Sequence, residues 1–200
     1  MNKPRISSLI VCACLCFATT AFADSFDDGL RAYIAGDYAK AFQIMQLLAE
    51  QGNAKAQSNL GVMYENGRGV AQDYAEAVRW FRKAADQGDA KAQLNFGVKY
   101  FEGRGIKQDY AEALRWFRKA ADQGFAQAQS NLGVMYAEGQ GVTQDDAEAL
   151  KWFKLAEAAG NTDATKACAE LSKLMTPEQI ATAQQRATEW MQKRQATAPQ

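Results

Sequence analysis

The sequence contains no histidine in its 200 residues. Histidine is the usual general base, the usual activator of a serine or cysteine nucleophile and the commonest zinc ligand, so Ser-His-Asp and Cys-His sites are excluded. The paired acids Asp145 and Asp146 stand at a predicted helix start, where carboxylates stabilise the helix dipole, and no second acid cluster is placed to face them. We therefore expect a protein that is not an enzyme and that uses no cofactor and no metal.

Cysteines and long apolar runs are also scarce. Three of the four cysteines lie within the first 16 residues, together with a basic start, an apolar run over residues 6–17 and the small-residue site Ala21-Phe22-Ala23. This pattern predicts a signal peptide at residues 1–23. No later apolar run approaches the roughly 20 residues that a membrane helix needs, so we expect no membrane insertion after cleavage and a periplasmic or secreted protein.

Removal of the leader would leave Cys168 as the single cysteine, which excludes an intramolecular disulfide. A lipoprotein signal at Cys14 is the alternative to simple cleavage, although the residues before it fit such a site poorly. Without the two basic residues of the leader, 21 basic residues stand against 23 acidic ones. This balance supplies no field for a polyanion, so we predict no nucleic-acid partner.

The most informative feature that is present is a repeat with a period of 36 residues. The segment Ala54–Gly61 returns at Ala90–Gly97 and Ala126–Gly133, and the pair Trp80-Phe81 returns twice at the same spacing. In each repeat, apolar residues recur at helical spacing in two separate stretches, which predicts two helices per repeat. A fixed period of this length is typical of a solenoid whose units stack on one another.

Local signals mark where these helices begin and end. An aspartate stands three residues before a glutamate at the start of each second helix, a variant of the capping box in which the glutamate can reach back to the cap. A glycine stands where the same helix must stop and the chain turn left-handed. The predicted caps are Asp73, Asp109 and Asp145, and the predicted stops are Gly52, Gly88, Gly124 and Gly160.

Two further sets of glycines need an explanation. Gly61, Gly97 and Gly133 fall inside the first helix, where glycine costs about 1 kcal/mol relative to alanine. Close approach of the paired helix, with an alanine opposite, would offset that cost. Pairs such as Gly67 and Gly69 superficially resemble a phosphate-binding loop, but they join two helices and occur three times, so we interpret them as turns with positive φ.

The pattern Ala, Leu-Gly, Tyr, Gly-x-Gly-Val, Asp-Tyr, Ala, Trp-Phe, Ala-Ala, Gln-Gly over residues 52–159 resembles the Sel-one-like repeat (SLR), a longer-looped relative of the tetratricopeptide repeat. The resemblance implies an all-α fold, a right-handed α/α superhelical solenoid of helix-turn-helix repeats, which we expect to be a monomer. The predicted divisions are a signal peptide (1–23), a tetratricopeptide-like hairpin (26–51), SLR repeats (52–87, 88–123 and 124–159), C-terminal capping helices (160–195) and a disordered tail (196–200).

The end of the array has its own pattern. Cys168 stands at a core leucine position, which favours a buried, inert thiol. Thr176-Pro177-Glu178-Gln179 is a strong helix start, with threonine as the cap and glutamine in the capping-box slot. The helix that follows carries one apolar stripe, which we expect to seal the open end of the solenoid.

Side chains that the repeat does not need for folding are the candidates for function. The phenylalanines of the Trp-Phe pairs have core spacing, whereas Trp80, Trp116 and Trp152 are one position round the helix and are expected to be half exposed. Matching the tetratricopeptide pattern implies that one face of each first helix lines a concave groove. The predicted partner-binding residues there are Asn59, Val62, Leu94, Asn95, Val98, Phe101, Asn131 and Val134. The asparagines have the alternative role of bonding neighbouring helices.

These observations favour a non-enzymatic scaffold or adaptor of the bacterial periplasm or extracellular space, which binds a segment of a protein or peptide partner in its groove. The alternative is an envelope binder or weak hydrolase of small molecules of the beta-lactam kind, because some secreted relatives implied by the resemblance have that activity. The chain lacks their paired cysteines and has no Ser-x-x-Lys motif.

Overall fold

The computed structural model describes residues 25–197, and the predicted signal peptide and the last three residues lie outside the described residues. Within this range all regular structure is helical. The helices are α1 (Phe26–Ile34), α2 (Tyr38–Glu50), α3 (Ala54–Asn66), α4 (Tyr74–Asp86), α5 (Ala90–Glu102), α6 (Tyr110–Asp122), α7 (Ala126–Glu138), α8 (Asp146–Ala158), α9 (Thr162–Ser172) and α10 (Pro177–Thr197). The predicted tail at 196–200 therefore begins too early, because α10 continues through residue 197.

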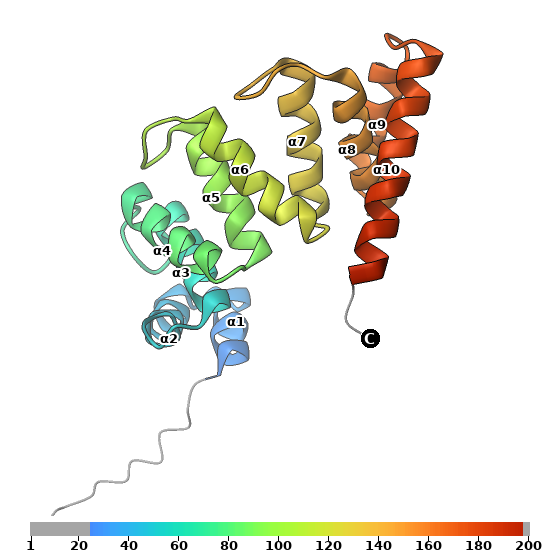
Figure 1. Ribbon diagram of the computed structural model, residues 1–200. Helices are drawn as coiled ribbons and strands as arrows, with labels where there is room; N and C mark the ends of the chain where they lie inside the picture. Colours follow the sequence, from blue (N-terminus) through green and yellow to red (C-terminus); the bar gives the residue numbers. More distant parts are fainter. Residues whose placement is uncertain (1–24, 198–200) are drawn as a thin grey trace, which may run out of the picture.

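Helices α1 to α8 form four antiparallel pairs that stack in chain order (Figure 1). Each first helix packs against its own second helix, and each second helix also packs against the first helix of the next pair. The second and third pairs (α3/α4 and α5/α6) are thus covered on both sides by neighbouring pairs, as a stacked array requires. The predicted all-α solenoid of helix-turn-helix repeats is confirmed.

Capping side chains begin the second helices where the sequence predicts. One carboxylate oxygen of Asp73 accepts hydrogen bonds from the backbone N–H groups of Ala75 (2.9 Å) and Glu76 (3.0 Å), and the corresponding aspartates cap α6 and α8. The predicted return bond from the glutamate to the cap is not the contact found, because the Glu76 carboxylate accepts from Arg79 (2.7 Å) instead. Half of the capping box is present in these helices.

The glycine inside each first helix lies against the second helix of its own repeat. A Cβ atom added at Gly97 would lie 2.6 Å from the ring of Phe117, well inside van der Waals contact. The predicted close approach is confirmed: the nearest neighbour is the phenylalanine ring, and the carbonyl oxygen of the predicted alanine, Ala113, follows at 3.4 Å. In the loops, Gly105 has a φ of +74°, and a Cβ there would collide with the carbonyl of Tyr74. This loop glycine both turns the chain and packs on the preceding repeat.

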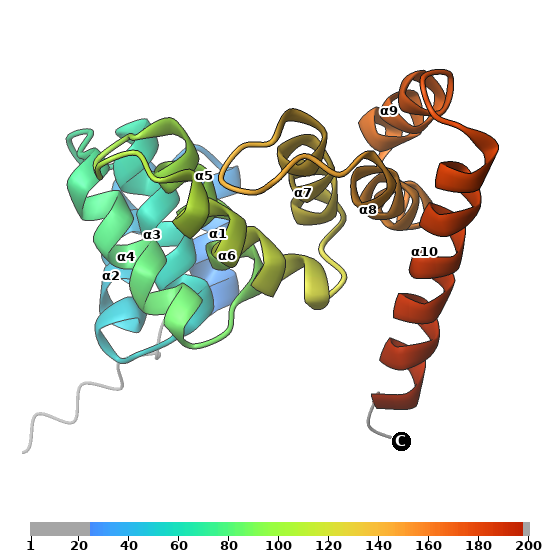
Figure 2. The ribbon, with the colours of Figure 1, turned by 45° about the horizontal axis from the view of Figure 1, so that its top comes forward.

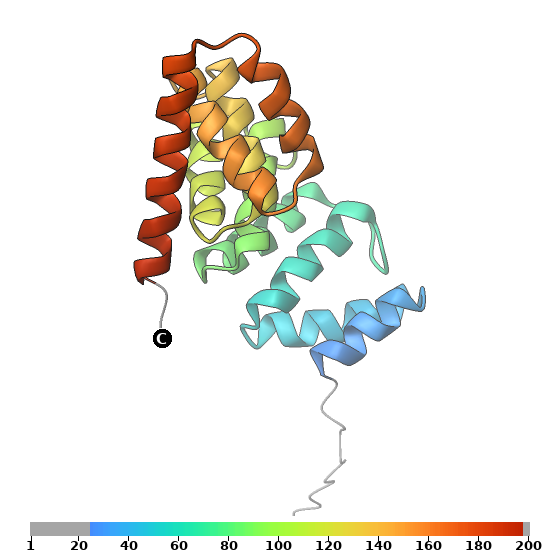
Figure 3. The same cartoon turned by 90° about the vertical axis from the view of Figure 1, so that its right-hand side faces the viewer.

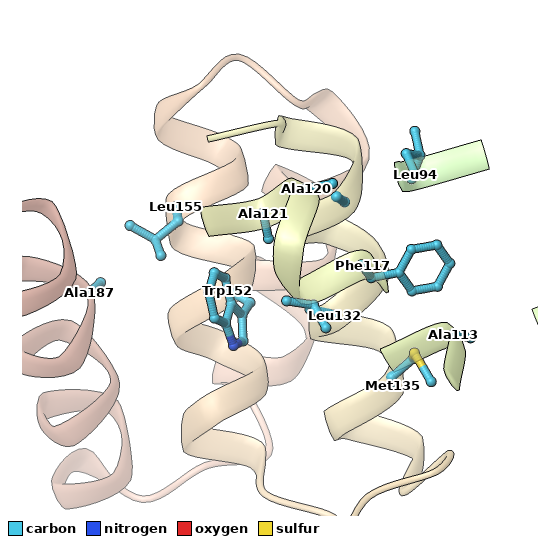
Figure 4. Packing of buried hydrophobic residues seen from close by; sticks show 11 residues of the cluster. Leu94, Ala113, Phe117, Ala120, Ala121, Leu132, Met135, Trp152, Leu155 and Ala187 are labelled. Carbon is cyan, nitrogen blue, oxygen red and sulfur yellow. The ribbon is translucent and has the colours of Figure 1, made fainter. Parts of the chain in front are cut away.

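Buried side chains from successive helices interlock along the array. In one cluster, Leu94 from α5, Phe117 from α6, Leu132 from α7 and Trp152 from α8 pack together (Figure 4). Phe125, at the N-cap position of α7, makes no capping hydrogen bond and packs partly buried against this cluster. Packing therefore explains why an aromatic residue stands at the position where Asn53 and Asp89 cap α3 and α5.

Trp80, Trp116 and Trp152 are buried, so the prediction that these three are half exposed is wrong. Trp80 packs into the cluster of the preceding α2 and α3, and the Lys83 ammonium lies 4.2 Å above its ring. The ammonium of Lys119 lies 3.9 Å above Trp116 in the same way. Long basic side chains lay their aliphatic stems over apolar surface while the charge stays in water. The lysine one turn further along the helix thus covers a tryptophan ring that its position on the helix alone would leave exposed.

Helix α10 packs along α8 and extends beyond it (Figure 2), and α8 lies between α9 and α10 (Figure 3). Ala183 and Ala187 are buried against α8, which carries Leu155 where α4 and α6 carry exposed Lys83 and Lys119. The apolar stripe of α10 therefore covers the outer surface of α8. It does not close the end of the array, where α9 instead presents its polar side chains.

Polar contacts fix α10 in this position. Arg186 donates to Asp145 (3.1 Å) and Glu148 (3.3 Å) at the start of α8. Partial burial acts to raise the pKa of the Asp145 carboxyl, but hydrogen bonds from the Glu148 N–H and from Arg186 hold it below its usual value. The predicted capping box of α10 is confirmed, since the Thr176 hydroxyl accepts from the N–H of Gln179 (3.3 Å) and the glutamine oxygen accepts from the N–H of Thr176 (2.8 Å).

Candidate partner-binding groove

The first helices of the three full repeats, α3, α5 and α7, carry all the residues for which the sequence predicts partner contacts. The loops that follow α5 and α7 both lie along the upper edge of the array in Figure 1, so the two helices run in roughly the same direction. Residues at equivalent positions therefore form rows across the helices. Asn59, Asn95 and Asn131 form one row, and Val62, Val98 and Val134 form the next, nearly one turn along.

A pocket of about 370 Å³ lies between α5 and α7. Its lining consists of Leu94, Val98, Phe101 and Glu102 from α5, Phe117 from α6, and Gln127, Asn131 and Val134 from α7. Five of the eight predicted residues thus meet at one pocket. The other three, Asn59, Val62 and Asn95, do not line it.

Part of the pocket wall also belongs to the hydrophobic core. Leu94 lines the pocket but is only 9% exposed, because its side chain also packs toward α6 and α7. The ring of Phe101 lies 6.4 Å from that of Phe117 and 5.2 Å from that of Tyr110, measured between centroids. Val134, at 37% exposed, is the most accessible apolar side chain of the lining.

The asparagine row makes hydrogen bonds within its own helices. Asn59 Nδ2 donates to the backbone carbonyl of Lys55 (2.8 Å), and Asn131 Oδ1 accepts from Gln127 Nε2 (3.3 Å). The oxygen of Gln127 in turn accepts from Asn161 Nδ2 at the start of α9 (3.4 Å). The alternative role, bonding between neighbouring helices, is therefore not the one that Asn59 and Asn131 have. Two amide side chains, Gln127 and Asn131, border the pocket on the α7 side.

Glu102, the one charged residue of the lining, belongs to a small ionic network. Its carboxylate lies 3.3 Å from Arg104 Nε and 3.7 Å from Lys99 Nζ. Lys99 is 2% exposed and also forms an ion pair with Glu65 of the preceding repeat. Lys99 is therefore held between α3 and α5. The carboxylate of Glu102 lies at the edge of the pocket.

Sequence reasoning missed Lys99 and Glu102. For Lys99 a signal was present, because the equivalent residues of the other repeats are buried methionines, Met63 and Met135. A lysine at a buried methionine position must find a carboxylate.

The pocket lining consists of five apolar side chains, two amides and one carboxylate. Across residues 25–197, no group of three or more Cys, Asp or Glu side chains is placed to hold a metal ion. Burial raises the pKa of the Cys168 thiol to about 11, with Glu157 adding to the effect, so the thiol stays protonated at neutral pH. None of the helices in the described range is both long and apolar enough to cross a bilayer.

The chain resembles proteins of one repeat family along most of its length. Four segments match the Sel1 repeat: residues 23–53, 54–89, 90–125 and 126–161. The first segment includes the hairpin for which the sequence predicts a tetratricopeptide-like unit. No curated protein matches the chain significantly.

Two crystal structures have a similar fold. A Sel1 repeat protein from Oxalobacter formigenes is 36% identical, with a TM-score of 0.69 over 72% of this chain and 59% of that one. A protective antigen present in uropathogenic Escherichia coli strains, displaying an SLR fold, is 30% identical, with a TM-score of 0.73 over 86% of this chain and 41% of that one. This chain thus spans less than two thirds of either relative.

Proposed function

This chain belongs to the Sel1 repeat family, whose members are generally non-catalytic scaffolds for protein–protein interaction, and from that membership we propose that it binds a segment of a protein partner in its groove. The pocket between α5 and α7 receives an apolar side chain of that segment. Gln127 and Asn131 bond polar groups beside it.

The pocket itself is the observation that carries this proposal. Five of its eight lining side chains are apolar, and Val98, Phe101 and Val134 remain partly open to solvent. Full burial of one large apolar side chain is worth about 1.5 to 3 kcal/mol, so a single anchor supplies a useful part of a micromolar affinity. Apolar side chains gathered in a concave site are a liability unless something covers them.

The test is affinity capture with the protein and with a Val98→Ser/Val134→Ser double variant, followed by identification of the captured proteins by mass spectrometry. Loss of two valine contacts should weaken binding of the main partner by about a hundredfold. Phe101 and Leu94 are left unchanged because they pack against Phe117 and their loss would weaken folding as well.

Leu174→Ser is the matched control, because Leu174 is 84% exposed in the turn before α10 and lies outside the pocket. Both variants should keep the helicity and melting temperature of the parent protein. Undiminished capture by the double variant would mean that the groove is not the site.

We also propose that the protein acts in the periplasm or outside the cell. The support is the basic start, the apolar run and the Ala-Phe-Ala site of residues 1–23, all of which lie outside the described residues. The balanced charge favours a protein partner over a polyanion.

The volume of the pocket favours a second candidate function, binding of a small molecule, since about 370 Å³ falls in the range of small-ligand sites. Beta-lactams are the class to test first. Addition of one to the protein should raise its melting temperature by mass action if this candidate holds, and should leave it unchanged if the pocket serves a polypeptide side chain.

A further inference from the structure

The middle repeat departs from the other two at the positions that enlarge the apolar wall of the pocket. Leu94 stands where both other repeats carry a serine, and Phe101 stands where they carry Glu65 and Ala137. Both side chains line the pocket between α5 and α7. The other repeats fold with serine and with glutamate or alanine at these positions, so the repeat itself does not require a leucine and a phenylalanine there.

The rest of the lining on the first helices follows the repeat. Val98 and Val134 belong to the valine row, and Asn131 belongs to the asparagine row. The pocket therefore consists of side chains that recur along the groove, together with two large apolar side chains that occur only in the middle repeat. Binding energy at an interface is commonly concentrated in a few anchors that fill pockets, and these departures place one such pocket on the groove.

Aromatic rings meet at this pocket. The ring of Phe101 is tilted by 60° to that of Tyr110 and by 45° to that of Phe117, at the centroid separations given above. Phe101 and Phe117 both line the pocket, and Phe101 stays partly exposed. Aromatic side chains attract one another in offset or edge-to-face contacts at centroid separations of about 4.5 to 7 Å. A ring that enters the pocket therefore gains ring contacts in addition to the burial that any apolar side chain gains.

The volume of the pocket favours the larger rings. An apolar cavity of about 150 Å³ is enough to bind benzene, and this pocket has about 370 Å³. Valine or leucine would leave much of that space without dispersion contacts, whereas the two fused rings of tryptophan fill more of it than one ring does. The single charged residue of the lining, Glu102, already lies beside Lys99 and Arg104, so the pocket calls for an uncharged occupant.

We propose that the pocket takes an aromatic side chain of the partner segment, tryptophan in preference to phenylalanine, and that Phe101 determines this preference. The ring packs against Phe101 between the two valines. The amides of Gln127 and Asn131 border the same pocket and bond the peptide groups next to the anchor residue. This inference rests on the proposed function, because it names the partner chemistry of the same groove.

The test begins with a display library of random octapeptides selected on the purified protein and counter-selected on the Val98→Ser/Val134→Ser variant. The expected result is enrichment of peptides that share one aromatic residue. Synthetic versions of an enriched peptide with tryptophan, phenylalanine or leucine at that position are then compared by calorimetry. The tryptophan peptide should bind most tightly and the leucine peptide about tenfold more weakly.

Phe101→Leu keeps most of the apolar contact with Phe117 but removes the ring. It should reduce the preference for tryptophan over leucine to about threefold or less. Phe42→Leu on α2 is the matched control, because Phe42 is also partly buried and its ring lies 5.5 Å from that of Tyr64, outside the pocket. This control should keep the full preference, and circular dichroism melts check that both variants are folded.

The outcomes separate this inference from the proposed function. Equal binding of the tryptophan and leucine peptides to the unaltered protein would overturn the aromatic anchor, although binding lost on Val98→Ser/Val134→Ser would still support the groove. An unchanged preference in folded Phe101→Leu would overturn the role of Phe101. If no enriched peptide depends on the two valines, the proposed function itself fails.

Discussion

Replacement of Ala159 by glutamine should stabilise the protein, because it would complete a row of buried amides that the third repeat leaves unfinished. Gln57 and Gln93 each donate from Nε2 to a backbone carbonyl of the preceding second helix, at 3.0 and 3.2 Å. Each also accepts from the glutamine that ends its own repeat, Gln87 (2.7 Å) and Gln123 (2.8 Å).

In the third repeat the donor is missing. Gln129 donates to the carbonyl of Ala121 (3.2 Å), but its buried Oε1 has no hydrogen-bond partner, since alanine occupies position 159. The backbone there has φ −89° and ψ 9°, close to the φ −82° and ψ −2° of Gln87. A glutamine can therefore take the position without backbone strain.

The expected gain follows from two opposing terms. A buried acceptor without a partner costs about 1 to 3 kcal/mol, and ordering a glutamine side chain costs up to about 1.5 kcal/mol. The net stabilisation should be about 0.5 to 1 kcal/mol, or a rise of about 1 to 4 °C in melting temperature for a protein of this size. Thermal and urea unfolding followed by circular dichroism measure it.

Matched variants isolate the hydrogen bond. Ala159→Glu has nearly the same shape without an amide donor, and it should give no gain. Gln87→Ala reproduces the defect of the third repeat in the first and should cost about 1 to 2 kcal/mol. Equal effects of glutamine and glutamate at position 159 would refute this account of the buried amide row.

Two further predictions concern the fold and the leader. Gly97→Ala should destabilise the protein by about 1 to 3 kcal/mol in urea unfolding, because its Cβ would lie 2.6 Å from the Phe117 ring, and a neutral result would contradict close helix packing. N-terminal sequencing of the exported protein should begin at Asp24, whereas a cytoplasmic protein that retains Met1 would rule out the proposed localisation.

Features that depend on interactions between residues close in the sequence were predictable. An aspartate that caps a helix and a glycine that ends one act on backbone groups a few residues away, so Asp73 and Gly88 mark the ends of α4 without knowledge of its neighbours. The 36-residue period also predicts which helices pair, because equivalent helices make equivalent contacts in each repeat. The rows of asparagine and valine on the first helices follow from the same period.

Features that depend on what packs against a helix were not predictable in this way. Helical spacing places Trp152 one position away from the core face of α8. Helix α10 nevertheless packs along α8 and covers this position, and the centroid of the Trp190 ring lies 6.1 Å from that of Trp152. The signal for this docking was the apolar Leu155 on an otherwise basic surface. This signal is recognised only when the sequences of α4, α6 and α8 are aligned.

Lys99 illustrates how a change in one repeat depends on the repeat before it. A buried ammonium is costly unless paired, and removal of one partner of such a pair typically costs about 3 to 5 kcal/mol. The carboxylate that pairs with Lys99 belongs to Glu65 on α3, at a position where the next two repeats carry Phe101 and Ala137. The middle repeat therefore fits best after the first one, because after either of the others Lys99 would keep only the more distant carboxylate of Glu102, at 3.7 Å. Phe101 lines the pocket in the middle repeat. The equivalent residue of the preceding repeat, Glu65, instead neutralises the buried charge of Lys99.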